Sequence, residues 1–140
     1  MGIEADLASF KSRLFVAIEN TMQTNVLDAA KTEIFDILND YKWTKSRGPA
    51  IGSEGLRDRE QMLGSTERIN NQVVLEITDD ADFQNGEPLN DGDTLDEVVT
   101  RGDKAYRMPE PRPFMQPAEE KMGEGTFEKA LAAGLRERGF

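Results

Sequence analysis

The sequence predicts an α+β fold in which a long N-terminal helix and a C-terminal helix pack on a small antiparallel β-sheet. Apolar residues recur every three or four positions across residues 3–42 and again after residue 117, which is typical of amphipathic helices. Between these segments, β-branched residues flank Asn70-Asn71 as in a β-hairpin. We expect one domain made of a helical segment (1–43), a sheet with an acidic loop and a short helix (55–108), and a proline segment with a final helix (109–140).

Composition restricts the chemistry that this chain can perform. The 140 residues include neither cysteine nor histidine, so thiolate and imidazole ligands, nucleophiles and general bases are all absent. No serine lies in a nucleophile motif, and no glycine loop has the spacing of a phosphate-binding loop. We therefore predict that the protein is not an enzyme and binds no cofactor.

The net charge of −10 would repel nucleic-acid phosphates and anionic membranes. The N-terminus lacks the basic start of a secretory signal, and no apolar run has the length of a membrane span. We expect a location in the cytosol and no membrane partner.

The N-terminal segment is predicted to be one long helix with a weak joint near residues 20–26, or two helices in sequence. The joint is a polar patch of poorer helix formers. The apolar face is broad, and it meets either a neighbouring subunit or the core of its own domain. Its main positions are Ile3, Leu7, Phe10, Leu14, Ile18, Met22, Leu27, Ala30, Ile34, Ile37 and Tyr41.

A glycine-containing loop from Trp43 to Gly55 carries the basic residues Lys45 and Arg47, and is either a contact for phosphate or an acidic partner or a solvated connector. A short element of undecided type then runs from Gly55 to Leu63. In the hairpin that follows (67–78), Val73, Leu75 and Ile77 should face the core while the alternate residues face solvent.

Residues 79–93 are acidic and rich in turn formers, a composition that calcium-binding loops share. Counting from Asp80, the sixth position is Asn85 where an EF-hand needs Gly, and the twelfth is Asp91 where it needs Glu. We reject an EF-hand and expect a solvated loop. A looser Ca²⁺ or Mg²⁺ site, in a binding module or a metal-dependent enzyme, stays as the alternative function, with Asp80, Asp82, Asp91 and Asp93 as its ligands.

Thr94 and Glu97 form a capping-box pattern that predicts a two-turn helix ending at Gly102. A short final strand is expected over Lys104–Met108, with Tyr106 and Met108 pointing inward.

Four of the six prolines fall within residues 109–118. Since proline fixes its own φ and favours extended geometry before it, this segment should be a stiff strut that sets the direction of the last helix, although an ordinary loop is also compatible. Phe114 and Met115 are its apolar anchors. Pro117 is suited to the first turn of a helix that continues to Arg138 and is weakened at Gly123 and Gly125.

The end of the sequence resembles the C-terminal region of the tail-completion (neck, head–tail joining) proteins of long-tailed bacteriophages. The resemblance is carried by a short C-terminal helix and by the residues before it, Arg112-Pro113-Phe114-Met115-Gln116-Pro117-Ala118. Gly55-Leu56-Arg57-Asp58 and the segment from Glu97 to Gly102 are also loosely similar to that family, whereas the acidic insertion at 79–93 departs from it.

The resemblance implies a structural virion protein of the neck or tail, made in the host cytoplasm, that forms a homo-oligomeric ring, typically a hexamer. Its implied partners are the connector or head-completion protein and the tail-tube or tail-terminator protein, with DNA passing through the lumen without specific binding. The implied interaction residues are Arg112, Pro113, Phe114, Met115 and Pro117. A further hypothesis is that the protein is a monomeric bacterial adaptor.

Overall fold

The longest element is a continuous helical rod with one widened turn. The computed structural model describes residues 3–43, 53–83 and 87–140. The rod consists of α1 (Ile3–Thr21), a π-helical turn η1 (Met22–Val26) and α2 (Leu27–Asp40). Thr24 Oγ1 donates to the carbonyl of Asn20 at 2.7 Å, a local side-chain bond that disturbs regular helix geometry. The joint predicted at 20–26 is therefore a widened turn within one helix.

The predicted hairpin is present and longer than expected at both ends. Strands β1 (Met62–Ile69) and β2 (Gln72–Asp79) pair antiparallel, with Ile69 opposite Gln72. Asn70 has a φ of 56°, the left-handed geometry that a tight two-residue turn requires. Val73, Leu75 and Ile77 are half-buried and their neighbours along β2 are exposed, which confirms the predicted alternation.

The undecided element before β1 is a short helix, α3 (Ser53–Leu56), followed by a 3₁₀ turn, η2 (Arg59–Gln61). The capping-box helix is α4 (Leu95–Arg101): Thr94 Oγ1 accepts from the Glu97 N–H at 3.3 Å, and Gly102 ends the helix with a φ of 73°. Both features confirm the sequence prediction.

The prediction of a strand over Lys104–Met108 is wrong. These residues form a 3₁₀ turn, η3 (Lys104–Tyr106), and only Asp103 and Met108 pair as an isolated bridge. The Asp103 carboxylate accepts from the Ala105 N–H at 2.9 Å and Arg107 has a φ of 58°, so local bonds fold the chain back on itself. Tyr106 and Met108 are nevertheless buried, as expected.

The C-terminal helix begins at Met115, two residues before the predicted start. It comprises α5 (Met115–Lys121), a π-helical turn η4 (Met122–Thr126) and α6 (Phe127–Glu137). Pro117 lies in the first turn, where the backbone N–H has no helical acceptor and its loss is harmless. Gly125 has a φ of 119° and marks a kink, so the weakness expected in this region is confirmed.

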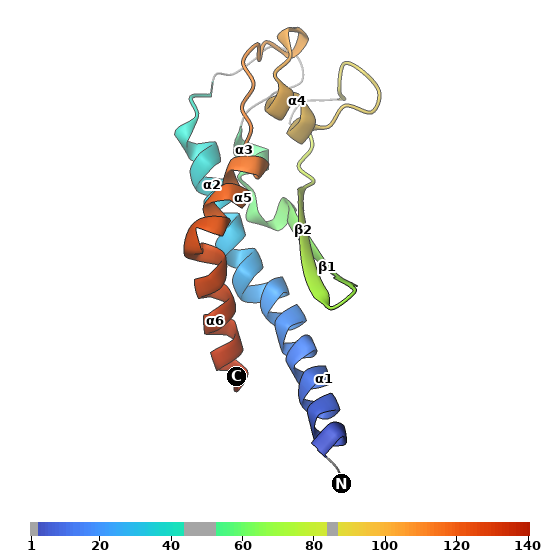
Figure 1. Cartoon of the computed structure of the whole chain (residues 1–140). Coiled ribbons are helices and arrows are strands. Elements are labelled where there is room, and N and C mark those ends of the chain that lie inside the picture. The colour runs from blue at the N-terminus through green and yellow to red at the C-terminus, as the bar shows by residue number, and fades with distance from the viewer. Residues whose placement is uncertain (1–2, 44–52, 84–86) are drawn as a thin grey trace.

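Figure 1 shows how these parts are arranged. α6 runs back along the rod beside α1, and the hairpin lies on another side of the same rod, while α3 and α4 lie at the far end from both termini. The two long helical elements thus pack on one face of the two-stranded sheet, which confirms the predicted α+β class.

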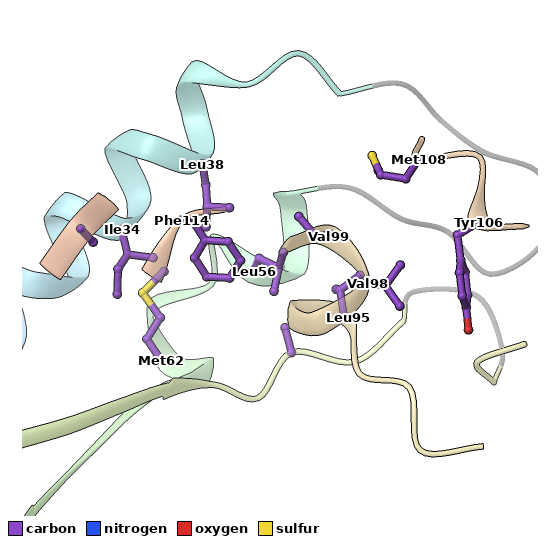
Figure 2. Close-up of a cluster of buried hydrophobic side chains, with 12 residues drawn as sticks. Ile34, Leu38, Leu56, Met62, Leu95, Val98, Val99, Tyr106, Met108 and Phe114 are labelled. Atoms are coloured by element: carbon purple, nitrogen blue, oxygen red, sulfur yellow. The ribbon is translucent and has the colours of Figure 1, made fainter. Parts of the chain in front are cut away.

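Two apolar clusters hold this arrangement. The Met22 cluster joins the rod, the inner face of the hairpin and α6; it contains Met22, Val26, Ala30 and Met122, with Val73, Leu75, Ile77, Phe127 and Leu131 packed against them. The Phe114 cluster joins α2, α3, α4 and α5 (Figure 2); it contains Ile34, Leu38, Leu56, Met62, Ala81, Leu95, Val98, Val99, Tyr106, Met108, Phe114 and Ala118.

α6 approaches the rod most closely at Gly134. A Cβ on Gly134 would lie 2.3 Å from Thr21 Cγ2 and 2.9 Å from Asn25. Arg138 secures the same crossing, since its guanidinium donates to Thr24 Oγ1 at 3.0 Å and Asn25 Oδ1 at 3.3 Å. Gly134 therefore permits a close helix contact within one chain.

We predict that Gly134→Ala lowers the free energy of unfolding by about 1–3 kcal/mol, because the added methyl group overlaps Thr21 and forces the helices apart. The matched control is Gly123→Ala, where a Cβ would meet nothing within 4 Å. That change should raise stability by about 0.5–1 kcal/mol through helix propensity. Urea unfolding followed by circular dichroism measures both, and equal stability of the two variants would contradict the predicted contact.

Candidate functional site

The proline segment is fastened to the body of its own chain. Phe114 is completely buried and caps the start of α5. The Arg112 N–H donates to the carbonyl of Val99 at 2.9 Å, and the carbonyl of Pro113 accepts from the Tyr41 hydroxyl at 2.8 Å. These bonds tie the segment to α4 on one side and to the end of α2 on the other.

The remaining predicted interaction residues also contact their own chain. The Arg112 guanidinium lies over the Trp43 ring, with its central carbon 5.1 Å from the ring centroid, and it also donates to the sulfur of Met108. Met115 packs half-buried against the Phe114 cluster. Pro117 is half-buried in the first turn of α5. The structure thus brings all five residues together at the junction between the proline segment and α5.

Gly102 allows the close approach of this segment, a role that its position at a helix end did not reveal. A Cβ there would lie 2.8 Å from both the Glu110 carbonyl carbon and the Pro111 nitrogen. The glycine therefore serves two needs at once, a left-handed backbone and room for the proline segment.

Beside this junction lies an apolar groove with a cavity volume of about 440 Å³. One wall is the rod, the second is β2, and the third is α5 with η4. Its lining residues are mostly apolar, and the two acidic ones are Glu119 on α5 and Glu76 on β2. The lining residues are Met22, Val26, Ala30, Ile34, Val74, Leu75, Glu76, Ile77, Met115, Ala118, Glu119, Met122 and Phe127.

Sequence reasoning did not predict the groove. Among its lining residues, Met22, Ala30, Ile34, Leu75 and Ile77 were expected on apolar faces of helices and strands, whereas Val74 and Glu76 were expected on the solvent face of the hairpin. Periodicity does not distinguish a filled interior from an open one. The abundance of methionine among them (Met22, Met115 and Met122) is the one available signal, because methionine is common on adaptable binding surfaces.

The structure does not bring the proposed acidic metal ligands together into one site. Asp93 is already engaged: its carboxylate accepts from the Tyr106 hydroxyl at 2.9 Å and from Arg101 at 3.2 Å. The Tyr106 bond, followed by the Arg101 contacts, lowers the pKa of Asp93. Within residues 3–43, 53–83 and 87–140, no group of three or more acidic side chains could hold a metal ion. The basic residues Lys45 and Arg47 lie outside the described residues.

Asp79, the last residue of β2, is an unusual acidic residue because it is only 5% exposed. One of its oxygens accepts from the Ala81 N–H at 3.2 Å, and the other has no partner among the described residues. Burial raises the pKa of Asp79 to about 7, with smaller contributions from the charges of Asp96, Asp80 and Asp58, although the Ala81 bond opposes the rise.

None of the helices in the described parts of the chain combines the length and the apolar character needed to cross a membrane.

We predict that Phe114→Ala lowers the free energy of unfolding by about 3–5 kcal/mol, because it opens a cavity at the meeting point of four helices. Leu89→Ala is the control, since Leu89 is 52% exposed and its truncation should change stability by no more than about 0.5 kcal/mol. Thermal unfolding monitored by circular dichroism compares them. A Phe114→Ala protein as stable as the control would disprove the anchoring role.

The pH dependence of stability tests the burial of Asp79. Its folded pKa of about 7 exceeds the unfolded value of about 4, so the folded state binds the extra proton between these limits. The contribution of Asp79 to the free energy of unfolding is therefore largest below about pH 4. It is lost as the pH rises to about 7, because the buried carboxyl group must then ionise.

Asp79→Asn should remove this loss and be more stable than the parent by roughly 2–4 kcal/mol at pH 8, with little difference at pH 4. The exposed Asp82→Asn serves as the control and should show no such pH-dependent gain. Denaturant unfolding at several pH values measures the difference, and a gain that is the same at pH 4 and pH 8 would contradict the assignment.

Comparison with protein-family models, with curated proteins and with solved structures finds no match to this chain. The resemblance at residues 112–118 therefore remains an expectation from sequence, and the function is argued from the geometry above.

Proposed function

We propose that this protein is a structural subunit of the bacteriophage neck or tail, where it forms a homo-oligomeric ring that completes the tail and joins it to the head connector. The proposal starts from the resemblance of Arg112–Ala118 to the close of tail-completion proteins. In the structure this run is the junction that directs the C-terminal helix back along the rod.

The observation that carries the proposal is an apolar surface that the described part of the chain leaves uncovered. In the first half of α1, Leu7 is 60% exposed and Phe10 is 47% exposed, while Val16, further along and on a different face of the helix, is 50% exposed. This half of the helix extends past the packed body, as Figure 1 shows. Large exposed apolar side chains gathered on one element are typical of a surface that is covered in an assembly.

Charge supports the passage of DNA through such a ring. The chain carries a net charge of −10, and an acidic lumen would repel phosphates and keep DNA from adhering as it moves. On this proposal the ring contacts the connector or head-completion protein at one end and the tail-tube or tail-terminator protein at the other. Its location is the virion, after assembly in the host cytoplasm.

We predict that the purified chain assembles into a ring, typically of six copies, either alone or on addition of connector-bearing heads. Mass photometry distinguishes this assembly from the 15.7 kDa monomer, and negative-stain electron microscopy reveals a ring. Tails that lack the protein should fail to join heads until it is added back. A chain that stays monomeric at every concentration, and binds neither heads nor tails, would contradict the proposal.

A further inference from the structure

Two apolar surfaces in different parts of this chain have side chains of opposite charge beside them. One is the groove between the rod, β2 and α5; the other is the exposed first half of α1. We propose that the first half of α1 from a neighbouring copy binds in the groove, so that copies join head to tail. This interface rests on the ring assembly proposed above and names the surfaces that build it.

The groove has the character of a receptor for a helix. Its volume of about 440 Å³ is in the roughly 300–1,000 Å³ range of small-molecule pockets, which leaves room for a few side chains from one face of a helix. Met22, Met115 and Met122 line it, and methionine adapts its shape to whatever side chains enter. Glu119 on α5 is exposed at the groove, whereas Glu76 lies on the exposed face of β2. An incoming helix would therefore meet apolar walls with the negative charge of Glu119 beside them.

The first half of α1 presents the opposite pattern. Leu7, Phe10 and Leu14 are spaced three and four residues apart and share one helical face. At about 100° per residue, Lys11 and Arg13 lie on the two sides of this apolar stripe. Residues 7–14 carry these two basic side chains and no acidic one, although the whole chain has a net charge of −10. Such opposed charges fix the register of an interface and favour encounter.

A chain cannot fill its own groove with this stripe. Leu7 lies fifteen residues before Met22 in a helix that continues through η1 into α2. At about 1.5 Å per residue, the stripe lies between about 12 Å (Leu14) and about 22 Å (Leu7) along the helix from Met22 in the groove wall. Phe10 contacts Phe140 of its own chain, with ring centroids 5.9 Å apart, yet Phe10 remains 47% exposed and Leu7 60% exposed. A second copy must supply the helix.

The proposed contact joins different patches on the two copies, so it is heterologous. Heterologous contacts generate a closed ring when the rotation between copies closes, and an open filament when it does not. The geometry therefore suits the ring that the proposed function requires.

Cross-linking between copies tests the interface directly, because the chain has no cysteine of its own. Leu7→Cys protein is mixed with Glu119→Cys protein and treated with a short thiol-specific cross-linker. Both sites are exposed, so the fold should be retained, as circular dichroism can verify. We expect a cross-linked dimer of the two variants. Ser12→Cys, on the opposite face of the same helix, is the matched control and should yield little of it.

Charge reversal provides a second, independent readout. Lys11→Glu combined with Arg13→Glu should weaken self-association by about tenfold or more, since like charges then face each other across the groove. Mixing this protein with the Glu119→Lys variant should restore assembly. Lys11, Arg13 and Glu119 are all exposed, so these changes should leave the fold intact.

The possible failures are distinguishable. Rings that persist in every variant, with Leu7→Cys cross-linking no better than Ser12→Cys, would overturn this interface and leave the proposed function standing. A chain that remains monomeric, alone and with connector-bearing heads, would overturn both.

Discussion

The burial of Phe114 is the contact on which the rest of the structure depends. Its ring lies in the cluster where α2, α3, α4 and α5 meet (Figure 2), and it stands at the end of a segment that proline has stiffened. The bonds from Tyr41 to Pro113 and from Arg112 to Val99 hold this segment on two sides. Because the Phe114 side chain is fixed in this cluster, it sets the direction of α5. From there α6 runs back along the rod.

The same geometry accounts for the groove. The rod and the C-terminal helix each contain a π-helical turn that contributes to the Met22 cluster. Met22 begins η1, and Met122 begins η4. Widened turns of this kind occur frequently at functional sites. On the proposed interface, a neighbouring copy covers the apolar walls of this groove and removes them from water. The stripe of Leu7, Phe10 and Leu14 on α1 is the segment proposed to do so.

Much of the fold was predictable from local sequence signals. Helical periodicity identified the rod, the polar patch at 20–26 marked its widened turn, alternation gave the faces of β2, and Thr94 with Glu97 located α4. The predicted strand at Lys104–Met108 failed because Asp103 bonds locally and Arg107 adopts a left-handed backbone, features that propensity does not reveal. The start of α5 was placed too late because proline is tolerated throughout the first helical turn.

The site was less predictable than the fold. The sequence indicated Phe114 as an anchor, but whether it anchored to its own chain or to a neighbour depended on long-range packing. The groove, the burial of Asp79 and the tight approach of Gly134 to Thr21 likewise arise from segments distant in the sequence. Single-sequence patterns specify which face of an element is apolar, and they do not specify what that face meets.

The central claim is that this subunit is built to receive its neighbour, with the first half of α1 as donor and the groove as acceptor. Hydrogen exchange measured by mass spectrometry on assembled and dissociated protein tests it most directly. The account predicts that assembly slows exchange in residues 7–16 of one surface and in β2 and α5–η4 of the other. Assembly that leaves exchange in these segments unchanged, while protecting amides elsewhere, would contradict it.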